Sequence, residues 1–160
     1  MGAAPEEACR PAVEPDVPRL VELAESAVAE LSAGRGGLVW ARTRPRRAPY
    51  GPGFAAALSD PEARVVVGTL DGTVMGYGAA RVEHLEDGGR LGVVEDLYTE
   101  PGCREVGLGE LMMEALIGWC REQGCFGVDS LALPGDRHTK NFFESFGLVA
   151  RAIIVHRSLS

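Results

Sequence analysis

The sequence predicts one mixed α/β domain, because segments with helical periodicity alternate with strand-like segments along the chain. Two observations carry this prediction. An apolar strand over 91–99 leads into a glycine-punctuated loop, and that loop opens directly into an amphipathic helix beginning at Leu108. The chain has 160 residues, the usual size of one domain, and shows neither a repeat nor a change of composition. We therefore expect a single domain over residues 1–160, with residues 1–7 flexible.

The first third of the chain predicts a helix followed by a loop. Asp16 is expected to be the N-cap of a helix over 17–31, which has apolar residues three and four positions apart. The segment 41–53 holds three prolines and four arginines, which are Arg42, Arg44, Arg46 and Arg47. This composition is typical of a long exposed loop without regular structure, and the arginines either are solvated or border a substrate mouth. A short helix over 54–58 is expected next.

The middle of the chain predicts antiparallel strands. Residues 64–70 and 73–82 are strand-like, and Asp71-Gly72 between them is a strong two-residue hairpin signal. A second turn over 86–89 leads into the strand over 91–99.

The last third predicts two helices and two further strands. Gly124 fits the end of the helix that begins at Leu108, and residues 126–133 are strand-like. Asp136 is expected to cap a short helix that ends at Gly147, and a final strand is predicted over 149–157.

The loop before the long helix is suited to hold a phosphate. Gly107 and Gly109 leave backbone N–H groups accessible at a helix N-terminus, where the helix dipole favours negative charge. The strand that feeds this loop carries two adjacent carboxylates, Glu95 and Asp96. On a regular strand these two side chains would point to opposite faces. An anion site beside a candidate base indicates a phosphate-bearing cofactor and proton chemistry.

Charge and composition exclude several classes of function. The net charge of −7 argues against nucleic-acid binding, although it is compatible with a cationic substrate. No apolar stretch is long enough to span a membrane, and the acidic N-terminus is unlike a signal peptide, so we expect a cytoplasmic protein. The cysteines form no C-x-x-C pair and the histidines lie far apart, which predicts free packed thiols and no metal site.

Two motifs give the sequence a family resemblance. One is Val94-Glu-Asp-Leu-Tyr-Thr-x-Pro-x-x-Arg104-x-x-Gly107-x-Gly109, in which strand, proline, arginine, both glycines and helix are in register. The other is Asn141-Phe-Phe-Glu-Ser-Phe-Gly147, about 35 residues downstream of the first. Together they resemble the GNAT superfamily of acyl-CoA-dependent N-acetyltransferases, over a span from about Ala8 to the C-terminus.

The resemblance implies a fold and an activity. The fold would be a mixed, mostly antiparallel central sheet of about six to seven strands flanked by about four helices. The activity would be transfer of an acetyl group from acetyl-CoA, as cosubstrate and without a metal, to a primary amine of a small molecule or peptide. The amine would attack the thioester directly in a ternary complex. The acceptor is not identified, and the oligomeric state stays open, with a homodimer as one option.

The resemblance also assigns roles to individual residues. Glu95 lies where related members keep the carboxylate that deprotonates the amine through water. The backbone of Leu97, Tyr98 and Thr99 would run beside the pantetheine arm, and Asp136 lies where many members have an asparagine that helps bind the cofactor. The pyrophosphate would be wrapped by the loop made of Arg104, Glu105, Val106, Gly107, Leu108, Gly109 and Glu110.

Two departures from the family pattern bear on activity. Phe143 stands where many members have a tyrosine that protonates the leaving thiolate. We expect the phenylalanine side chain to pack in the core and to contact the acyl pocket. Glu105 and Glu110 put negative charge beside the phosphate site. The alternative to an enzyme is therefore a catalytically weak or inactive CoA-binding regulatory or sensor module.

Three of these assignments have a simpler alternative. Glu95 or Asp96 could be an ordinary solvated strand carboxylate or a hydrogen-bond partner for a loop, and Asp136 could act as a helix cap alone. His84, near Glu83 and Glu86 at a strand end, either borders the acceptor site or is a surface histidine.

Overall fold

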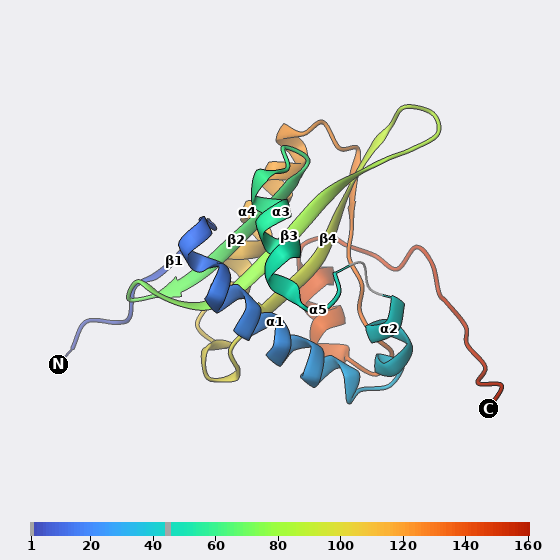
Figure 1. Ribbon diagram of the computed structural model, residues 1–160, viewed down its shortest axis with the longest axis horizontal. Coiled ribbons are helices and arrows are strands. Elements are labelled where there is room, and N and C mark those ends of the chain that lie inside the picture. The colour runs from blue at the N-terminus through green and yellow to red at the C-terminus, as the bar shows by residue number, and fades with distance from the viewer. Residues whose placement is uncertain (1, 44–45) are drawn as a thin grey trace.

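A five-stranded mixed sheet forms the centre of the computed structural model, which describes residues 2–43 and 46–160 (Figure 1). The strand order is β1-β2-β3-β4-β5; the first four strands pair antiparallel, and β5 pairs parallel to β4. The strands are β1 (Glu7–Pro11), β2 (Ala63–Leu70), β3 (Thr73–His84), β4 (Arg90–Thr99) and β5 (Gly127–Asp129). The predicted mixed, mostly antiparallel sheet is confirmed.

Helices cover both faces of this sheet, with α1 and α3 on one face and α4 and α5 on the other (Figure 1). The five α-helices of the described residues are α1 (Val17–Ser32), α2 (Gly37–Thr43), α3 (Tyr50–Ser59), α4 (Leu108–Glu122) and α5 (Arg137–Ser145). Two 3₁₀ turns, Glu14–Asp16 and Pro101–Cys103, precede α1 and α4. Within the described ranges no helix is long and apolar enough to span a membrane.

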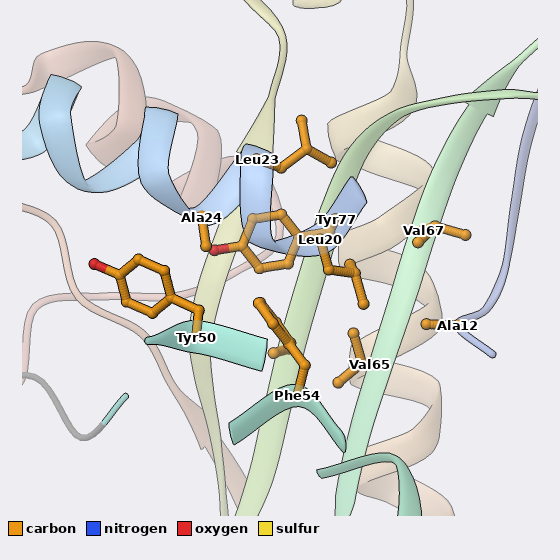
Figure 2. Close-up of a cluster of buried hydrophobic side chains, with 10 residues drawn as sticks. Ala12, Leu20, Leu23, Ala24, Tyr50, Phe54, Val65, Val67 and Tyr77 are labelled. Carbon is orange, nitrogen blue, oxygen red and sulfur yellow. The ribbon is translucent and has the colours of Figure 1, made fainter. Parts of the chain in front are cut away.

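The pleat of β2 divides the core into two clusters. Val65 and Val67 face α1 and α3, whereas Val66 faces the cluster formed with α4 and α5. Figure 2 shows the first cluster, in which the ring of Phe54 from α3 meets the ring of Tyr77 edge-on at 5.6 Å. Both side chains of this aromatic pair are fully buried. The sheet is therefore fixed between two apolar layers, which gives β4 a rigid position.

Turns and helix ends that were predicted from a few neighbouring residues are confirmed. Asp71 and Gly72 both have positive φ and join β2 to β3, as a two-residue hairpin requires. Gly124 also has positive φ and follows the end of α4. The four cysteines are free thiols that are buried or partly buried.

Strand number and strand length differ from the prediction. The described residues form five strands rather than six to seven, because the predicted strand over 149–157 has no regular structure and the one over 126–133 is limited to β5. A strand needs a partner for its backbone hydrogen bonds, and β-branched composition alone does not supply one. The short β1 was not predicted, because its five residues, Glu-Ala-Cys-Arg-Pro, lack an apolar run.

The prediction that segment 41–53 is entirely irregular was wrong. Helix α2 continues to Thr43, and α3 begins at Tyr50, four residues before the predicted start. Pro49 and Pro52 did not prevent this helix, because a proline at a helix start removes an N–H group that has no intrahelical partner there. Arg44 lies outside the described residues.

Asp16 precedes α1, as predicted, but its carboxylate caps a different turn. It accepts hydrogen bonds from the backbone N–H of Val13 at 2.8 Å and from both terminal nitrogens of Arg10 at 2.7 and 2.9 Å. It makes no side-chain hydrogen bond to α1. The hydrogen bonds from Arg10 hold the pKa of Asp16 below its usual value. This bidentate pair therefore fixes β1 to the start of α1.

We expect Asp16→Asn to lower the free energy of unfolding by about 1 kcal/mol near pH 7, because a charge-assisted pair with a half-exposed arginine is lost. The folded-state pKa of Asp16 lies below its unfolded value of about 3.9, so its contribution is present above that pH and disappears as the pH falls through the folded pKa. Urea unfolding near pH 7 and near pH 3 measures this difference. Glu25→Gln, at an exposed position on α1, is the control. An equal loss at both pH values would contradict the role of the charge.

Candidate active site

Six residues that the sequence singled out line one cavity of about 90 Å³. They are Glu95, Asp96, Leu97 and Tyr98 of β4, Asp136 at the start of α5, and Phe143 within α5. Residues from α1, α2 and the segment after β5 complete its wall. The cavity therefore lies at the middle of β4, where helices from both ends of the chain approach the sheet.

A β-bulge in β4 positions the candidate base. Ala79 of β3 pairs with Asp96 and Ala80 pairs with Val94, so Glu95 is an extra residue without a partner in β3. A bulge of this kind changes the direction of side chains relative to a regular pleat. On a regular strand Glu95 and Asp96 would point to opposite faces, but with the bulge both carboxylates contact Arg46.

Arg46 belongs to the arginine segment that the sequence left open as a border of the substrate mouth, but its contact with both carboxylates was not predicted. Its guanidinium pairs with the carboxylate of Asp96, lies 3.8 Å from Glu95 and lies 4.4 Å from the ring centroid of Phe54. Only 9% of its side chain is exposed. Of the two alternatives left open for the arginine segment, the structure therefore supports a place beside the site for Arg46. Arg47, the next residue, is exposed.

A second arginine holds Glu95 from β3. The Nε atom of Arg81 donates to Glu95 Oε1 at 2.7 Å, and its guanidinium also contacts Glu83. The carboxylates of Glu95 and Asp96 are 15% and 8% exposed. Two carboxylates in a partly dry environment would repel each other strongly, and the two arginines neutralise them. Glu95 is thus a paired residue at the cavity and not a solvated strand carboxylate.

The glycine loop leads from the end of β4 into α4, as predicted. Gly107 has a φ of 86°, a left-handed conformation that other residues rarely adopt, and it is the N-cap of α4. Leu108, Gly109 and Glu110 form the first turn of the helix, and their backbone N–H groups are those that a helix leaves without internal partners. Glu105 and Val106 belong to the turn before it.

The side chain of Arg104 stabilises this loop from the other side. It donates to the carbonyl oxygen of Thr99 at 3.1 Å and to Glu30 of α1 at 2.6 Å, and its guanidinium lies 5.5 Å from the Tyr98 ring centroid. The hydrogen bond with Glu30 raises the pKa of Arg104. The structure therefore assigns this side chain a structural contact between α1 and the end of β4. Its predicted role at a pyrophosphate stays a prediction.

The two glycines of the motif have different surroundings. A Cβ atom at Gly107 would lie 2.8 Å from a carboxylate oxygen of Glu7, so an acidic side chain already lies at the start of α4. A Cβ atom at Gly109 would lie 3.5 Å from the ring of Phe142, which is ordinary contact. Gly107 is thus favoured by its left-handed backbone, whereas the space between α4 and α5 at Gly109 would accept a Cβ atom.

For Asp136, the structure confirms the role as a helix cap and leaves the contact with a cofactor as a prediction. The carboxylate of Asp136 accepts hydrogen bonds from the backbone N–H of Thr139 at 3.0 Å and from its hydroxyl at 2.7 Å, as an N-cap does. Its predicted contact with a cofactor is not tested. Phe143 is buried in the second core cluster and also borders the cavity. His84 pairs with Glu62 at an exposed position and is not among the residues that line the cavity.

The sequence matches a family model over residues 22–148, and that model describes the acetyltransferase (GNAT) family. The match spans well over half of the chain, so the protein belongs to the GNAT acetyltransferase family. No curated protein sequence matches the chain. The described residues contain no group of three or more histidine, cysteine, aspartate or glutamate side chains suited to a metal ion.

Solved structures of the same fold cover almost the whole chain. An aminoglycoside N-acetyltransferase, AAC(6')-Iy in complex with CoA, has a TM-score of 0.76 at 14% identity, with 100% of this chain and 99% of that chain covered. Glucosamine-6-phosphate N-acetyltransferase from Arabidopsis thaliana has a TM-score of 0.70 at 19% identity, covering 97% and 99%. A transcriptional regulator from Bacillus halodurans C-125 has a TM-score of 0.72 at 18% identity, covering 96% and 100%. At these identities the likeness shows the fold.

Proposed function

We propose that the protein transfers an acetyl group from acetyl-CoA to the primary amine of a small molecule or peptide, within a ternary complex. One observation carries this proposal: β4 presents a carboxylate-lined cavity at Glu95 and ends in the glycine loop that begins α4. The helix start proposed to bind the anion and the carboxylate proposed as proton acceptor thus belong to one continuous segment. Membership of the GNAT family supports the same reaction.

The residues around the start of α4 fit the anionic part of acetyl-CoA. The left-handed Gly107 leaves the helix start without a side chain of its own, and the carboxylate of Glu7, 2.8 Å from where its Cβ atom would lie, would have to move aside for a phosphate to bind there. The backbone of Leu97, Tyr98 and Thr99 would lie beside the pantetheine arm, and the loop 104–110 beside the pyrophosphate. Acetyl-CoA would supply an activated thioester, so the protein needs no covalent nucleophile.

The chemical demand on the protein is to provide a neutral amine. A primary amine has a pKa near 10.4, so about one molecule in a few thousand is neutral near pH 7, a deficit of roughly 4–5 kcal/mol. We assign the proton acceptor to Glu95, which borders the cavity and is held in place by Arg81. Phe143 has no hydroxyl to protonate the leaving thiolate, but a thiol of pKa near 8.5 is a tolerable leaving group.

The acceptor side of the cavity favours a cation. Glu95 and Asp96 already bind a guanidinium, that of Arg46, against the ring of Phe54. A polycationic amine carries the same kind of charge and can replace Arg46 at these carboxylates. Aminoglycosides are the named substrate class of one structural neighbour, and they are polycationic amines.

A second candidate function rests on the same arginines. Because Glu95 and Asp96 are both paired within the chain, and because Phe143 replaces a tyrosine, the protein could bind CoA as a regulatory or sensor module without efficient turnover. Binding of CoA without thiol release from acetyl-CoA, across a broad panel of amines, would favour this function over the enzyme.

The cofactor site is tested by thermal unfolding. Acetyl-CoA at a hundredfold excess over its Kd should stabilise the wild-type protein by about 2.7 kcal/mol. Gly107→Val should remove this ligand-induced rise in Tm, because a β-branched side chain is strained at positive φ and would clash with the carboxylate of Glu7, which distorts the loop at the helix start. The rise is measured relative to each variant without ligand. Gly102→Val is the control, since a Cβ atom there meets nothing within 4 Å. An unchanged ligand-induced rise in the Tm of Gly107→Val would show that the phosphate site lies elsewhere.

The base is tested by the pH dependence of turnover, followed as free-thiol release. We expect Glu95→Gln to lower kcat/KM by roughly 10²–10⁴ near pH 7, the usual contribution of general acid–base catalysis. The defect should shrink as the pH approaches the pKa of the amine, because the solvent then supplies neutral amine. The Kd of acetyl-CoA should stay unchanged. A loss that is independent of pH would instead identify Glu95 as a substrate-binding anion.

The position of Arg46 predicts that removing its side chain improves the binding of a polycationic acceptor. Arg46→Ala should lower KM for a polycationic acceptor such as an aminoglycoside by about tenfold, because a charge-assisted contact of about 1.4 kcal/mol passes from the protein to the substrate. Arg47→Ala, one residue away and exposed, should leave KM unchanged. Steady-state kinetics with both variants measure the difference. A higher KM in Arg46→Ala would show that Arg46 helps to build the acceptor site rather than occupying it.

A further inference from the structure

A second hollow, which we call the α4 hollow, lies where the C-terminal half of α4 packs against β1 and β2. Its volume is about 370 Å³, larger than that of the cavity beside Glu95, and the two have no lining residue in common. Trp119, which lines the α4 hollow, lies about 18 Å further along α4 than Gly107, since a helix rises 1.5 Å per residue. The hollow is therefore separate from the helix start to which the proposed function assigns the cofactor.

The pleat of β2 and a small residue of α4 keep this space open. Arg64 and Val66 are two positions apart in β2, so both lie on the face of the sheet that α4 covers. On α4, Gly118 has no side chain, and a Cβ atom built there meets nothing within 4 Å. No side chain therefore fills the space between helix and sheet at this level.

The indole of Trp119 brings an unused hydrogen-bond donor to the α4 hollow. Its side chain is only 5% exposed and packs in the second core cluster. Within the described residues its N–H group donates to no acceptor, although the protein does not enclose this group completely. Buried indole N–H groups usually have a partner. The α4 hollow is the space from which an acceptor atom of a ligand can reach it.

Two opposite charges on the wall of the α4 hollow are also unpaired. Arg64 is partly buried, and Glu122 at the end of α4 is exposed. In the part of the chain that the structure describes, neither side chain forms an ion pair or a hydrogen bond, with each other or with a third residue. Arg10, the remaining charged residue of the wall, is neutralised by Asp16. The α4 hollow therefore offers one cation and one anion to a ligand, with no net charge.

We propose that the α4 hollow binds a zwitterionic amino acid with an apolar side chain, as a ligand site in addition to the proposed active site. The ligand carboxylate accepts hydrogen bonds from the guanidinium of Arg64 and the indole N–H of Trp119, and its ammonium group pairs with Glu122. Its apolar side chain contacts Val66 and the ring of Trp119. A simple anion would leave Glu122 unpaired and a simple amine would leave Arg64 unpaired, whereas a zwitterion uses all three groups.

Nuclear magnetic resonance of the full chain tests the proposal. The chain has two tryptophans, so the two indole N–H signals are assigned by comparison with Trp40→Phe. L-Phenylalanine should shift the signal of Trp119 and leave that of Trp40 unchanged, with a Kd on the order of 1 mM for a ligand of this size. L-Phenylalaninamide lacks the carboxylate and N-acetyl-L-phenylalanine lacks the ammonium group. Each should bind at least about tenfold more weakly, because a charged contact is lost.

Substitutions at the two unpaired charges test the assignment of the ligand contacts. Arg64→Gln and Glu122→Gln should each raise the Kd of L-phenylalanine by about tenfold or more. The matched controls are Arg121→Gln and Glu114→Gln, at exposed positions of α4 outside the α4 hollow, and they should leave the Kd unchanged. All four variants should unfold at the wild-type temperature without ligand, because none of these side chains has a partner among the described residues.

Three results would overturn the proposal. One is an unchanged Trp119 signal with L-phenylalanine, L-leucine and L-methionine, each at about ten times the expected Kd. Another is equal binding of the amide or the N-acetyl derivative, which would show that the charges of the ligand are not recognised. The third is an unchanged Kd in Arg64→Gln and Glu122→Gln, or an equal loss in the two controls. Saturation with CoA should leave the Kd of L-phenylalanine unchanged, so these outcomes do not depend on the proposed acetyl transfer.

Discussion

The ion pairs between Arg46 and the β-bulge of β4 connect the parts of the molecule on which the site depends. The bulge makes Glu95 an extra residue, and as a result two neighbouring carboxylates reach one guanidinium. Arg46 in turn lies against Phe54, whose ring packs on Tyr77 at the centre of the sheet. The charged cluster is therefore supported by the most deeply buried aromatic pair of the first core cluster. A change in the packing of α3 would therefore alter the position of the charged side chains at the cavity.

The start of α4 is fixed by contacts that come from distant parts of the chain. Arg104 ties the end of β4 to Glu30 in α1, and Glu7 of β1 lies against Gly107. The glycine loop is thus held between the first strand and the first helix, although neither belongs to the motif. This arrangement gives the loop a defined shape before any ligand binds, which lowers the conformational cost of binding.

The sequence predicted those features that depend on neighbouring residues. The hairpin at Asp71-Gly72, the start of α4 at Leu108 and the cap at Asp136 each follow from a short local pattern, and all three are confirmed. The bulge at Glu95 and its contact with Arg46 depend on pairing across strands and on a residue 49 positions earlier, for which one sequence carries no signal. The strand predicted over 149–157 failed for the same reason, since composition does not reveal whether a partner strand is present.

The carboxylate of Glu7 at the start of α4 has a kinetic consequence. The positive end of a helix dipole attracts anions, but here an acidic side chain of the protein is already close to it, with Glu105 and Glu110 nearby in the sequence. The chain as a whole carries a net charge of −7. A polyphosphate ligand therefore approaches a surface that repels it, and electrostatic steering cannot accelerate its diffusional encounter. The lifetime of such a complex would have to come from short-range contacts made after arrival, and dissolved salt would ease the approach by screening the repulsion.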